Sequence, residues 1–450
     1  MAEPSTRDPF RVPPHDLLAE KSVLGAVLID TSAIATVAEF LKGPHFYQRE
    51  HQIIFNAMIK LFEKQQPIDV ITLRNQLQHE GELKNAGGQE YLAELVNAVP
   101  TSAYVEQYAH IIRAHYTKRK LIEVSSRAVE KAFEDKGEIK ELIDEIESEI
   151  FGLAEEHQHR DFIQLKEVLT TSFERLEEFM KSGTHTRGVA TGFAGLDNKL
   201  SGLMPANLVI LAARPGVGKT TFALNIALNV AMKDKKPVGF FSLEMSKEEL
   251  VDRLLVGHSD VDAWRLKTGR LTDDDTKRIV AAMGDLAEAP IYIDDTPGVS
   301  ILEMRTKARK LKAEKGLELL VVDYLQLADS GRRFDSRVQE VSFISLGLKN
   351  LARELQIPVL SLSQLWRAVD QRNDKKPQLA DLRESGAIEQ DADVVMFIYQ
   401  DDDGGDLLDN NQRIMKISIA KHRNGPTGEV DLMFRGDRVK FYNVDKSHEL

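Results

Sequence analysis

The chain has 450 residues, more than the roughly 250 to 300 at which a single hydrophobic core stops growing, so we expect two domains. It carries a net charge of −12 and no cysteine, which excludes disulfides, thiol catalysis, zinc ribbons and iron–sulfur clusters, and its scattered histidines predict no structural metal. No apolar run approaches the roughly 20 residues of a membrane span and the polar N-terminus lacks a secretory signal, so we expect a cytoplasmic protein without membrane contact.

The first predicted region, residues 1–156, is all-helical. Apolar residues recur at helical spacing in LLAEKSVLGAVL (17–28) and IIFNAMIKLFEK (53–64). Two longer helical patterns, at 104–133 and 140–156, are separated by a short Asp-Lys-Gly turn and predict a helical hairpin. The hairpin either closes the helical core or forms a platform for an oligomer contact or a partner protein.

A linker is predicted over residues 157–187. The polar, histidine-rich EEHQHRD ends the helical region, and LKEVLTTSFERLEEFMKSG (165–183) then forms a single amphipathic pattern. An isolated helix of this length is marginal in water. We therefore expect a linker helix that docks on a neighbour, although it could also be the first helix of the second domain.

The second predicted domain, residues 188–450, alternates short β-branched runs with helical segments. The runs are NLVILAA, PVGFFS, APIYID, LELLVVDYL, IPVLSLS, DVVMFIY and RIMKISIAK. This alternation is typical of the α/β class, with a mostly parallel sheet and helices on both faces.

The clearest chemical motif, ARPGVGKT from Ala213 onward, lies between a buried strand and a helix. Gly216 and Gly218 permit backbone conformations that point N–H groups at phosphate oxygens. Lys219 is expected to reach the β- and γ-phosphates of ATP, and Thr220 to give its hydroxyl oxygen to Mg²⁺. The first position of the general pattern GxxxxGKS/T is alanine here, and the sequence offers no physical reason for this departure. The expected nucleotide-binding residues of this segment are Arg214, Gly216, Gly218, Lys219, Thr220 and Thr221.

Three polar residues follow the ends of later predicted strands, where α/β sheets place their ligands. Asp323 ends the apolar run LLVVD and suits a carboxylate that holds Mg²⁺ together with Thr220, largely through water. Glu244 in GFFSLEM could orient or deprotonate the attacking water, and Gln364 in LSLSQL could sense the γ-phosphate. Each could instead be a simple strand-end cap. Together they predict an ATP-hydrolysing P-loop domain of the RecA-like class.

A basic pair lies in AKHRNGPTG, whose NGPTG is a tight-turn sequence between two strands. Lys421 and Arg423 are two residues apart and therefore share one face of the hairpin base. From there they could not easily fold back on the phosphate loop of their own chain, but could reach that of a neighbour as an arginine finger in trans. The alternative is an ordinary solvated basic pair.

Seven segments together resemble the DnaB family of bacterial replicative DNA helicases. They are TGFAGLDNKLSGL (191–203), ARPGVGKT, FFSLEMS (240–246), VVDYLQL (321–327), LSQL, DLRESGAIEQDADVV (381–395) and KHRNGPTG. PPHDLLAEKSVLGAVLID and REHQIIFNAMIKLF resemble that family's primase-interacting helical domain, so the resemblance covers nearly the whole chain. It implies a homohexameric ring, nucleoid-associated at replication forks, that encircles single-stranded DNA and translocates 5′ to 3′ with ATP and Mg²⁺. Primase and a helicase loader are the implied partners.

The resemblance also implies roles for individual residues. It assigns phosphate binding to Lys219 and Thr220, water activation to Glu244, Mg²⁺ to Asp323, γ-phosphate sensing to Gln364, the trans finger to Lys421 and Arg423, and a nucleotide contact to Arg253.

A further matching segment, around Arg383, Glu384 and Gly386, corresponds to the family's DNA-contacting pore loop. Arg383 would supply positive charge, and Gly386 would let backbone N–H groups approach phosphates, which suits tracking without sequence preference. Six such loops in a ring would explain how an acidic chain binds DNA, because the positive groups need only line the pore.

Two other function classes share some of these features. Another RecA-like DNA-dependent ATPase, such as a strand-exchange recombinase, or a clock-type ATPase would carry the same loop, but the helical N-terminal region and the single P-loop disfavour them. The absence of cysteine disfavours a zinc-bearing repair relative. A non-catalytic ATP-binding loading or scaffold protein is disfavoured by the joint presence of the loop lysine, both strand-end acids and Arg423.

Overall fold

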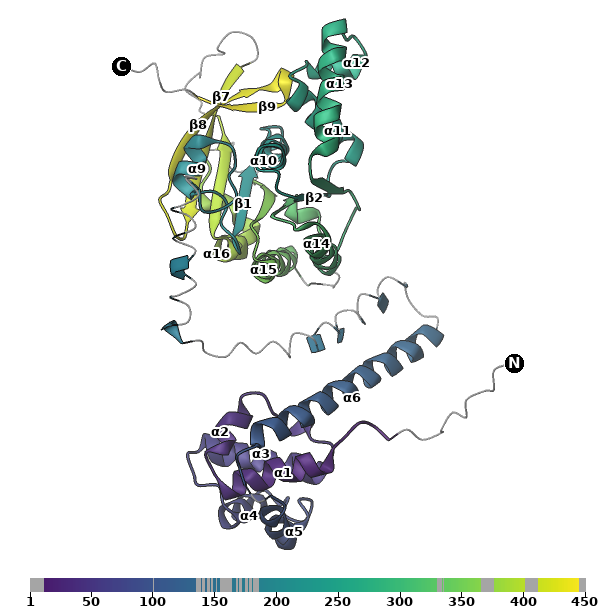
Figure 1. The fold of residues 1–450 in the computed structure, drawn as a ribbon, viewed down its shortest axis with the longest axis vertical. Helices are drawn as coiled ribbons and strands as arrows, with labels where there is room; N and C mark the ends of the chain where they lie inside the picture. Colours follow the sequence, from purple (N-terminus) through teal and green to yellow (C-terminus); the bar gives the residue numbers. More distant parts are fainter. Residues whose placement is uncertain are drawn as a thin grey trace, which may run out of the picture. The chain divides into compact units, whose positions relative to one another are not determined.

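The computed structural model of the chain describes residues 12–99, 101–134, 186–329, 336–365, 376–400 and 412–444, residue 334 and scattered positions between 139 and 180. The chain divides into two compact units, Met1–Ile163 and Gln164–Leu450 (Figure 1). Most of the predicted helices at 140–156 and 165–183 lies outside the described residues. No helix in the described part is both long and apolar enough to cross a membrane.

The N-terminal unit is helical throughout its described part. Its elements are α1 (Leu17–Ile29), α2 (Ala33–Ala38), η1 (Gly43–His45), α3 (Arg49–Glu63), α4 (Val70–His79), α5 (Gly88–Asn97) and α6 (Val105–Phe133). The predicted helices at 17–28, 53–64 and 104–133 correspond to α1, α3 and α6. The side chains of Asp16 and Asp69 accept backbone N–H groups in the first turns of α1 and α4, which fixes where these helices begin.

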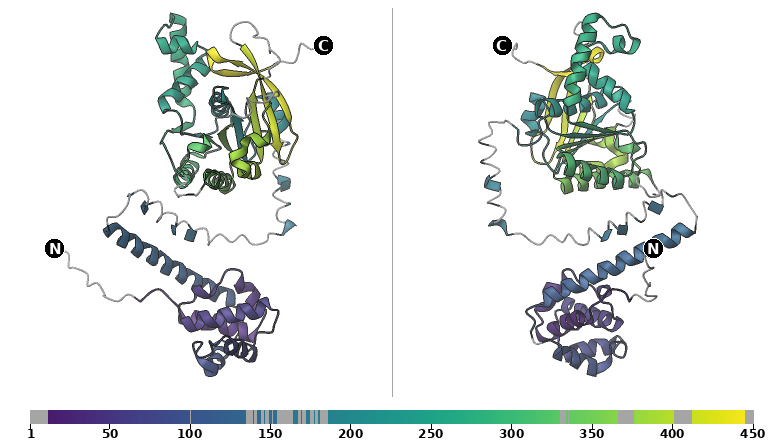
Figure 2. Two further views of the ribbon diagram at one scale, coloured as in Figure 1. Left: turned by 180° about the vertical axis from the view of Figure 1, so that it is seen from behind. Right: turned by 45° about the vertical axis from the view of Figure 1, so that its right-hand side comes forward.

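One hydrophobic core holds this unit together. Ile112 of α6 is buried in the same cluster as Leu24 of α1 and Phe55 of α3. Farther along, α6 extends beyond the other helices of the unit (Figure 2), and its Leu121 and Phe133 are exposed. The distal part of α6 is therefore an apolar surface that the described residues of this unit leave uncovered.

The C-terminal unit is organised around a nine-stranded sheet with the order β3-β2-β4-β5-β1-β6-β7-β8-β9. The strands are β1 (Leu208–Ala213), β2 (Val238–Ser242), β3 (Ile291–Asp294), β4 (Leu319–Asp323), β5 (Val359–Gln364), β6 (Val394–Tyr399), β7 (Gln412–His422), β8 (Gly428–Arg435) and β9 (Lys440–Asn443). Neighbours from β3 across to β6 pair in parallel, and those from β6 to β9 pair antiparallel. The prediction of a mostly parallel sheet is confirmed.

Helices cover both faces of this sheet. They are α9 (Ala194–Leu200), α10 (Lys219–Lys233), α11 (Lys247–Ser259), α12 (Ala263–Thr268), α13 (Asp273–Glu288), α14 (Ile301–Lys315), α15 (Arg337–Leu355) and α16 (Gly386–Asp391), with 3₁₀ segments η2 (Leu325–Leu327), η4 (Leu379–Ser385) and η5 (Gly436–Arg438). Alternate residues of β1 point to opposite faces. Val209 and Leu211 pack in the core that contains α9, α10 and part of α11, whereas Leu208 and Ile210 pack in the core of α14, α15 and α16.

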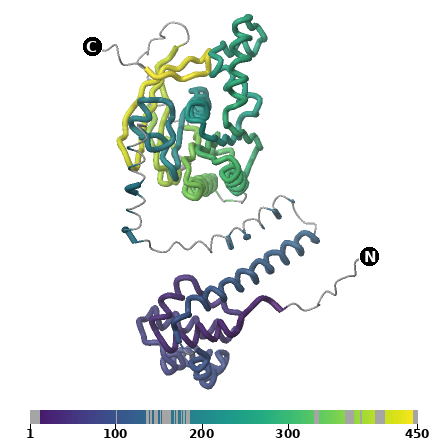
Figure 3. Tube along the Cα trace, in the orientation of Figure 1, coloured from purple at the N-terminus to yellow at the C-terminus, as the bar shows by residue number. Residues whose placement is uncertain are grey.

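The seven strand-like runs in the sequence all form strands, β1 to β7. β8 is the second arm of the predicted hairpin. The sequence pattern does not predict β9, because its four residues, KFYN, form no apolar run. The trace in Figure 3 shows these last strands beside α9, although α9 comes much earlier in the sequence.

Candidate nucleotide site

The loop between β1 and α10 requires glycine at two positions. Gly216 has a φ of 78° and Gly218 a φ of 99°, in the left-handed region that residues with a Cβ rarely adopt. No atom lies within 4 Å of the point where a Cβ on Gly216 would be, so the backbone angle alone demands glycine there. α10 begins directly afterwards at Lys219, and the first N–H groups of a helix have no intrahelical partner. The loop therefore has the form of an anion cradle.

Ala213, the departure from the general pattern, is the last residue of β1. It is 1% exposed and lies between Gln364 of β5 and Ile398 of β6 in the parallel register. Its φ is not positive. The position belongs to the sheet rather than to the turn, so a small buried residue in extended conformation suffices and glycine is not needed.

Lys219, Thr220 and Asp323 meet beneath the loop. The Thr220 hydroxyl donates a 2.7 Å hydrogen bond to Oδ2 of Asp323, and the Lys219 ammonium lies 3.9 Å from Oδ1 of the same carboxylate. Lys219 also lies 4.5 Å from the ring centre of Tyr324. Asp323 is fully buried at the end of β4, and among the described residues its Oδ1 has no hydrogen-bond donor. One carboxylate oxygen therefore keeps its full capacity to bind a ligand.

Burial moves both charged groups of this cluster toward their neutral forms. It lowers the pKa of Lys219, although Asp323 and Glu244 act in the opposite direction. It raises the pKa of Asp323, although Lys219 and Thr220 act to lower it. Each charge is thus disfavoured by burial more than it is favoured by its partner. A charged ligand would therefore stabilise the ionised forms of these residues: an anion would favour the Lys219 ammonium, and a cation would favour the Asp323 carboxylate.

A pocket of about 540 Å³ opens above the loop and brings together side chains from distant parts of the sequence. Glu244, two residues beyond β2, and Gln364, at the end of β5, both line it and are exposed to it. Arg253 of α11 also lines it and lies 3.5 Å from the Thr221 hydroxyl, to which it donates. The predicted part of the lining is completed by Arg214, Gly216, Gly218, Lys219, Thr220 and Thr221, and Ala213 lines the pocket as well, whereas Asp323 lies beneath it.

One wall of the pocket is absent from the sequence prediction. It comes from α12, from the end of β8 and from the connection between β8 and β9, and its residues are Ala263, Lys267, Phe434, Gly436 and Val439. No motif marks these positions, because they lie in ordinary helical and strand-end sequence. They meet only through the fold.

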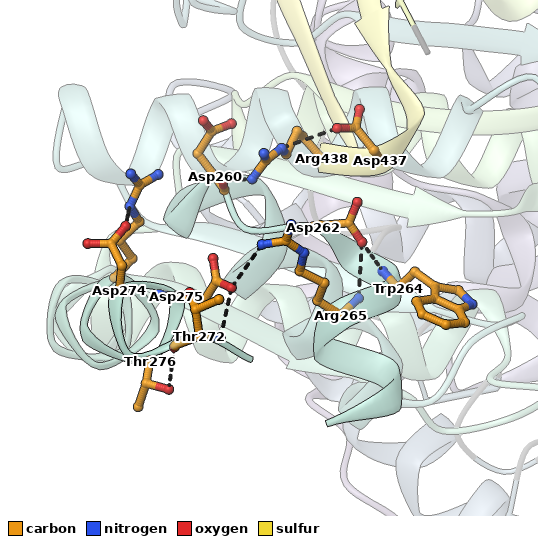
Figure 4. A network of polar contacts seen from close by, with 11 residues as sticks. Asp260, Asp262, Trp264, Arg265, Thr272, Asp274, Asp275, Thr276, Asp437 and Arg438 are labelled. Carbon is orange, nitrogen blue, oxygen red and sulfur yellow. Dashed lines mark hydrogen bonds and ion pairs between the residues drawn. The ribbon is translucent and has the colours of Figure 1, made fainter. Parts of the chain in front are cut away.

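Polar contacts hold this wall in place (Figure 4). Asp262 accepts two backbone N–H groups at the start of α12, and Arg265 donates a 3.2 Å bond to Asp275 in the first turn of α13. From the other side, Arg438 of η5 donates to the backbone oxygen of Asp260. The end of α11, which leads into α12, is therefore tied to η5.

Lys421 and Arg423 lie outside the pocket of their own chain. Arg423 is 3.5 Å from Oδ1 of Asp393, whose Oδ2 accepts the N–H of Leu208, the first residue of β1. The phosphate loop follows the last residue of this six-residue strand. At about 3.3 Å per residue the two ends are about 17 Å apart, so Arg423 cannot reach its own phosphate loop.

The predicted DNA-contacting residues follow β5 in the chain. Arg383 and Glu384 belong to η4, and their side chains lie outside the described part. Gly386 begins α16 with an ordinary helical φ of −50°, and nothing lies within 4 Å of a Cβ built on it. The fold itself therefore gives no reason for glycine at this position.

Comparison with known proteins identifies close relatives over the whole chain. The family model "DnaB-like helicase N terminal domain" matches residues 12–114, and "DnaB-like helicase C terminal domain" matches residues 188–443. The chain is 44% identical over 437 residues to the replicative DNA helicase DnaC of Bacillus subtilis (strain 168), covering 97% of this chain and 96% of the relative. It has the same identity, over the same shares of the two chains, to the replicative DNA helicase DnaB of Geobacillus stearothermophilus. A solved structure described as a DnaB-like replicative helicase and its interactions with primase matches with a TM-score of 0.74 and 34% identity, covering 96% of this chain and 100% of that one.

Proposed function

Because this chain belongs to the DnaB-like replicative DNA helicases, we propose that it hydrolyses ATP in sites shared between two subunits and thereby moves along single-stranded DNA. One observation carries this proposal. The phosphate loop with Lys219 and Thr220 lies at one end of β1, and the paired cations Lys421 and Arg423 lie at the other. A complete site then needs a second copy of the chain.

Mg²⁺ fits the oxygen atoms beneath the loop. The Thr220 hydroxyl and the Asp323 carboxylate are 2.7 Å apart, and the second carboxylate oxygen is buried with no hydrogen-bond donor among the described residues. Mg²⁺ prefers oxygen ligands and usually keeps several waters, so Thr220 would bind it directly and Asp323 largely through water. When bound, the ion would neutralise charge on the phosphates.

The remaining roles follow from position in the pocket. The Lys219 ammonium would bind the β- and γ-phosphates, whose negative charge would favour the charged form that burial disfavours. Glu244 stands clear of the sheet, where it can orient or deprotonate the attacking water. Gln364 ends the strand beside Ala213 and can bond the γ-phosphate. Arg214, Thr221 and Arg253 would contact the rest of the nucleotide.

The trans cations would act on the γ-phosphate of the neighbouring subunit. Arg423 is 47% exposed and does not line its own pocket, so it is available to another chain. An arginine delivered at the transition state typically increases phosphoryl transfer about 10³- to 10⁵-fold. Such a site hydrolyses ATP only when two subunits are correctly docked.

Single-stranded DNA would bind along η4 and the start of α16. Arg383 supplies a positive charge for phosphate, and Glu384 belongs to the same turn. Gly386 has helical backbone angles and open space on its Cβ side, so its glycine suits the close approach of a ligand to the backbone. Contacts of this kind bind the DNA backbone with little base preference.

The assembly we propose is a homohexameric ring that translocates 5′ to 3′ and unwinds forked DNA. A closed ring of identical subunits gives each phosphate loop a neighbouring finger. The exposed apolar side of α6, with Leu121 and Phe133, offers the N-terminal unit a surface for primase, the partner named for the related solved helicase. A helicase loader would place the ring on DNA.

Fork unwinding tests this proposal directly. The chain is mixed with forks that carry either a 5′ or a 3′ single-stranded tail, with ATP and Mg²⁺. We expect strand separation only with the 5′ tail, and none from the Lys219→Ala variant. Unwinding by that variant would overturn the site, and strand exchange without unwinding would identify a recombination ATPase instead.

A further inference from the structure

Asp393 connects the trans cation to the body of the ATPase unit. It lies between α16 and β6, and its side chain is only 7% exposed. One oxygen, Oδ2, accepts the Leu208 N–H at 2.8 Å and the Lys349 ammonium at 2.5 Å. The other, Oδ1, lies 3.5 Å from the Arg423 guanidinium. The carboxylate is thus anchored through one oxygen and holds the finger through the other.

The two halves of this arrangement differ in how firmly they are held. Lys349 is 15% exposed and also donates to the backbone oxygen of Ala206 at 3.0 Å, so it stays in place. Arg423 is 47% exposed, and an ion pair so open to water is weak. The anchor is therefore fixed and the finger is free to exchange.

The same cations hold the end of α16. The Lys421 ammonium donates to the backbone oxygen of Glu389 and the Arg423 guanidinium to that of Gln390. These carbonyls belong to the last turn of the helix, where positive charge is favourable. Gly386, proposed to contact DNA, is the first residue of the same six-residue helix. A short rigid element therefore joins the finger to the DNA loop.

We propose that Asp393 is a positioning residue that competes with the γ-phosphate of the neighbouring subunit for Arg423. When the neighbouring subunit holds no triphosphate, Arg423 remains paired with Asp393 and bonded to the end of α16. When the neighbour binds ATP, the guanidinium moves to the phosphate and releases the C-terminal end of α16. The DNA loop at the other end of the helix then changes its affinity for single-stranded DNA. This inference rests on the proposed trans site and extends it to a residue that touches neither nucleotide nor DNA.

Replacing Asp393 by asparagine tests the competition. Asparagine keeps the size and can still accept the Leu208 N–H, but it loses the charge that attracts Arg423. We expect DNA-independent ATP turnover to rise about two- to fivefold, the factor that a half-exposed ion pair represents, with the KM for ATP unchanged. The affinity for single-stranded DNA should become nearly independent of whether ADP or a non-hydrolysable ATP analogue is bound.

Lys349→Gln is the matched variant. It removes the other charge on Asp393 and leaves that carboxylate to attract Arg423 more strongly. Basal turnover should therefore fall and the nucleotide dependence of DNA affinity should increase, opposite in sign to Asp393→Asn. A purely structural role for Asp393 predicts that both variants lower the melting temperature and reduce turnover together. Lower melting temperature and lower turnover in both variants would overturn the proposal. The Lys349→Gln variant keeps this test decisive even if Asp393→Asn folds poorly.

The background variant Arg423→Ala separates this inference from the trans site itself. If Asp393 acts through Arg423, adding Asp393→Asn to Arg423→Ala leaves the ratio of DNA affinities with ADP and with the analogue unchanged. A further change in that ratio would overturn the inference while leaving the trans site intact. An Arg423→Ala chain with full turnover and wild-type coupling would instead overturn the trans site, and this inference with it.

Discussion

The buried pair Lys219 and Asp323 is expected to lower the stability of the nucleotide-free protein, although both residues are needed to bind the nucleotide. The double variant Lys219→Met with Asp323→Asn replaces both charges by neutral groups of similar size. At 3.9 Å and an effective dielectric of 20, the lost attraction amounts to about 4 kcal/mol. Removing two ions from a buried site recovers several kcal/mol for each. Both pKa shifts point toward the neutral forms, so the recovered desolvation exceeds the lost attraction.

Without nucleotide, the double variant should therefore be as stable as the original chain or more stable, by up to about 3 kcal/mol. For a unit of this size that corresponds to a rise of about 6 °C or less in melting temperature, measured by calorimetry. With saturating Mg²⁺ and ATP analogue the order should reverse. Binding at 1,000 times Kd stabilises the original chain by about 4.1 kcal/mol, which exceeds the advantage of up to about 3 kcal/mol that the variant has without nucleotide, and the variant gains nothing from the ligand.

ATP turnover by the same double variant should be lost. A fall of more than about 5 °C in the melting temperature of the nucleotide-free variant would refute the reasoning, because the pair would then be holding the fold together. Stabilisation of the variant by Mg²⁺ and ATP analogue, equal to that of the original chain, would equally refute the assignment of both residues to the nucleotide.

Three further changes test separate parts of the molecule. Glu244→Gln should bind ATP with nearly unchanged affinity but hydrolyse it about 10²- to 10⁴-fold more slowly, since Glu244 would act on water and not on the nucleotide; equal loss of binding and turnover would count against this role. Gly386→Ala should raise the free energy of unfolding by about 0.5–1 kcal/mol, because the position is helical and open. The same variant should bind single-stranded DNA about 2- to 10-fold more weakly, as measured by fluorescence anisotropy. An unchanged affinity for DNA would remove Gly386 from the DNA site. Burial lowers the pKa of His45 from 6.5 to about 4. Between these two pH values the imidazole is protonated in the unfolded chain but neutral in the folded chain, so the free energy of unfolding decreases as the pH falls from 6.5 to about 4. In calorimetry, His45→Asn should flatten this loss between about pH 7 and pH 4.5, and an identical slope would argue against a buried neutral histidine.

Much of the site could be predicted because its chemistry needs particular residues at fixed spacing. Gly216 and Gly218 adopt angles that only glycine tolerates easily, and Lys219 and Thr220 follow at once where the helix begins. Asp323 was recognisable as an acid at the end of a fully buried strand. Such positions are constrained locally, so a single sequence reveals them.

The rest depends on tertiary contacts that leave no local pattern. Lys267 and Phe434 line the candidate nucleotide pocket only because α12 and the end of β8 meet there. Asp393 lies in the family-like segment DLRESGAIEQDADVV, beyond the predicted DNA-contacting residues, and its contacts are with Leu208, Lys349 and Arg423. Its position between cation and sheet follows from the register of β6 and β7 and could not be read from spacing.

The shared site is tested most directly by mixing two inactive chains. Arg423→Ala subunits keep Glu244, and Glu244→Ala subunits keep Arg423, so some interfaces of a mixed ring contain both intact residues. In an equal, randomly assembled mixture about one interface in four is complete. We predict that ATP hydrolysis, absent in either variant alone, recovers in the mixture toward that fraction. No recovery at any ratio, in rings shown to contain both chains, would contradict the account.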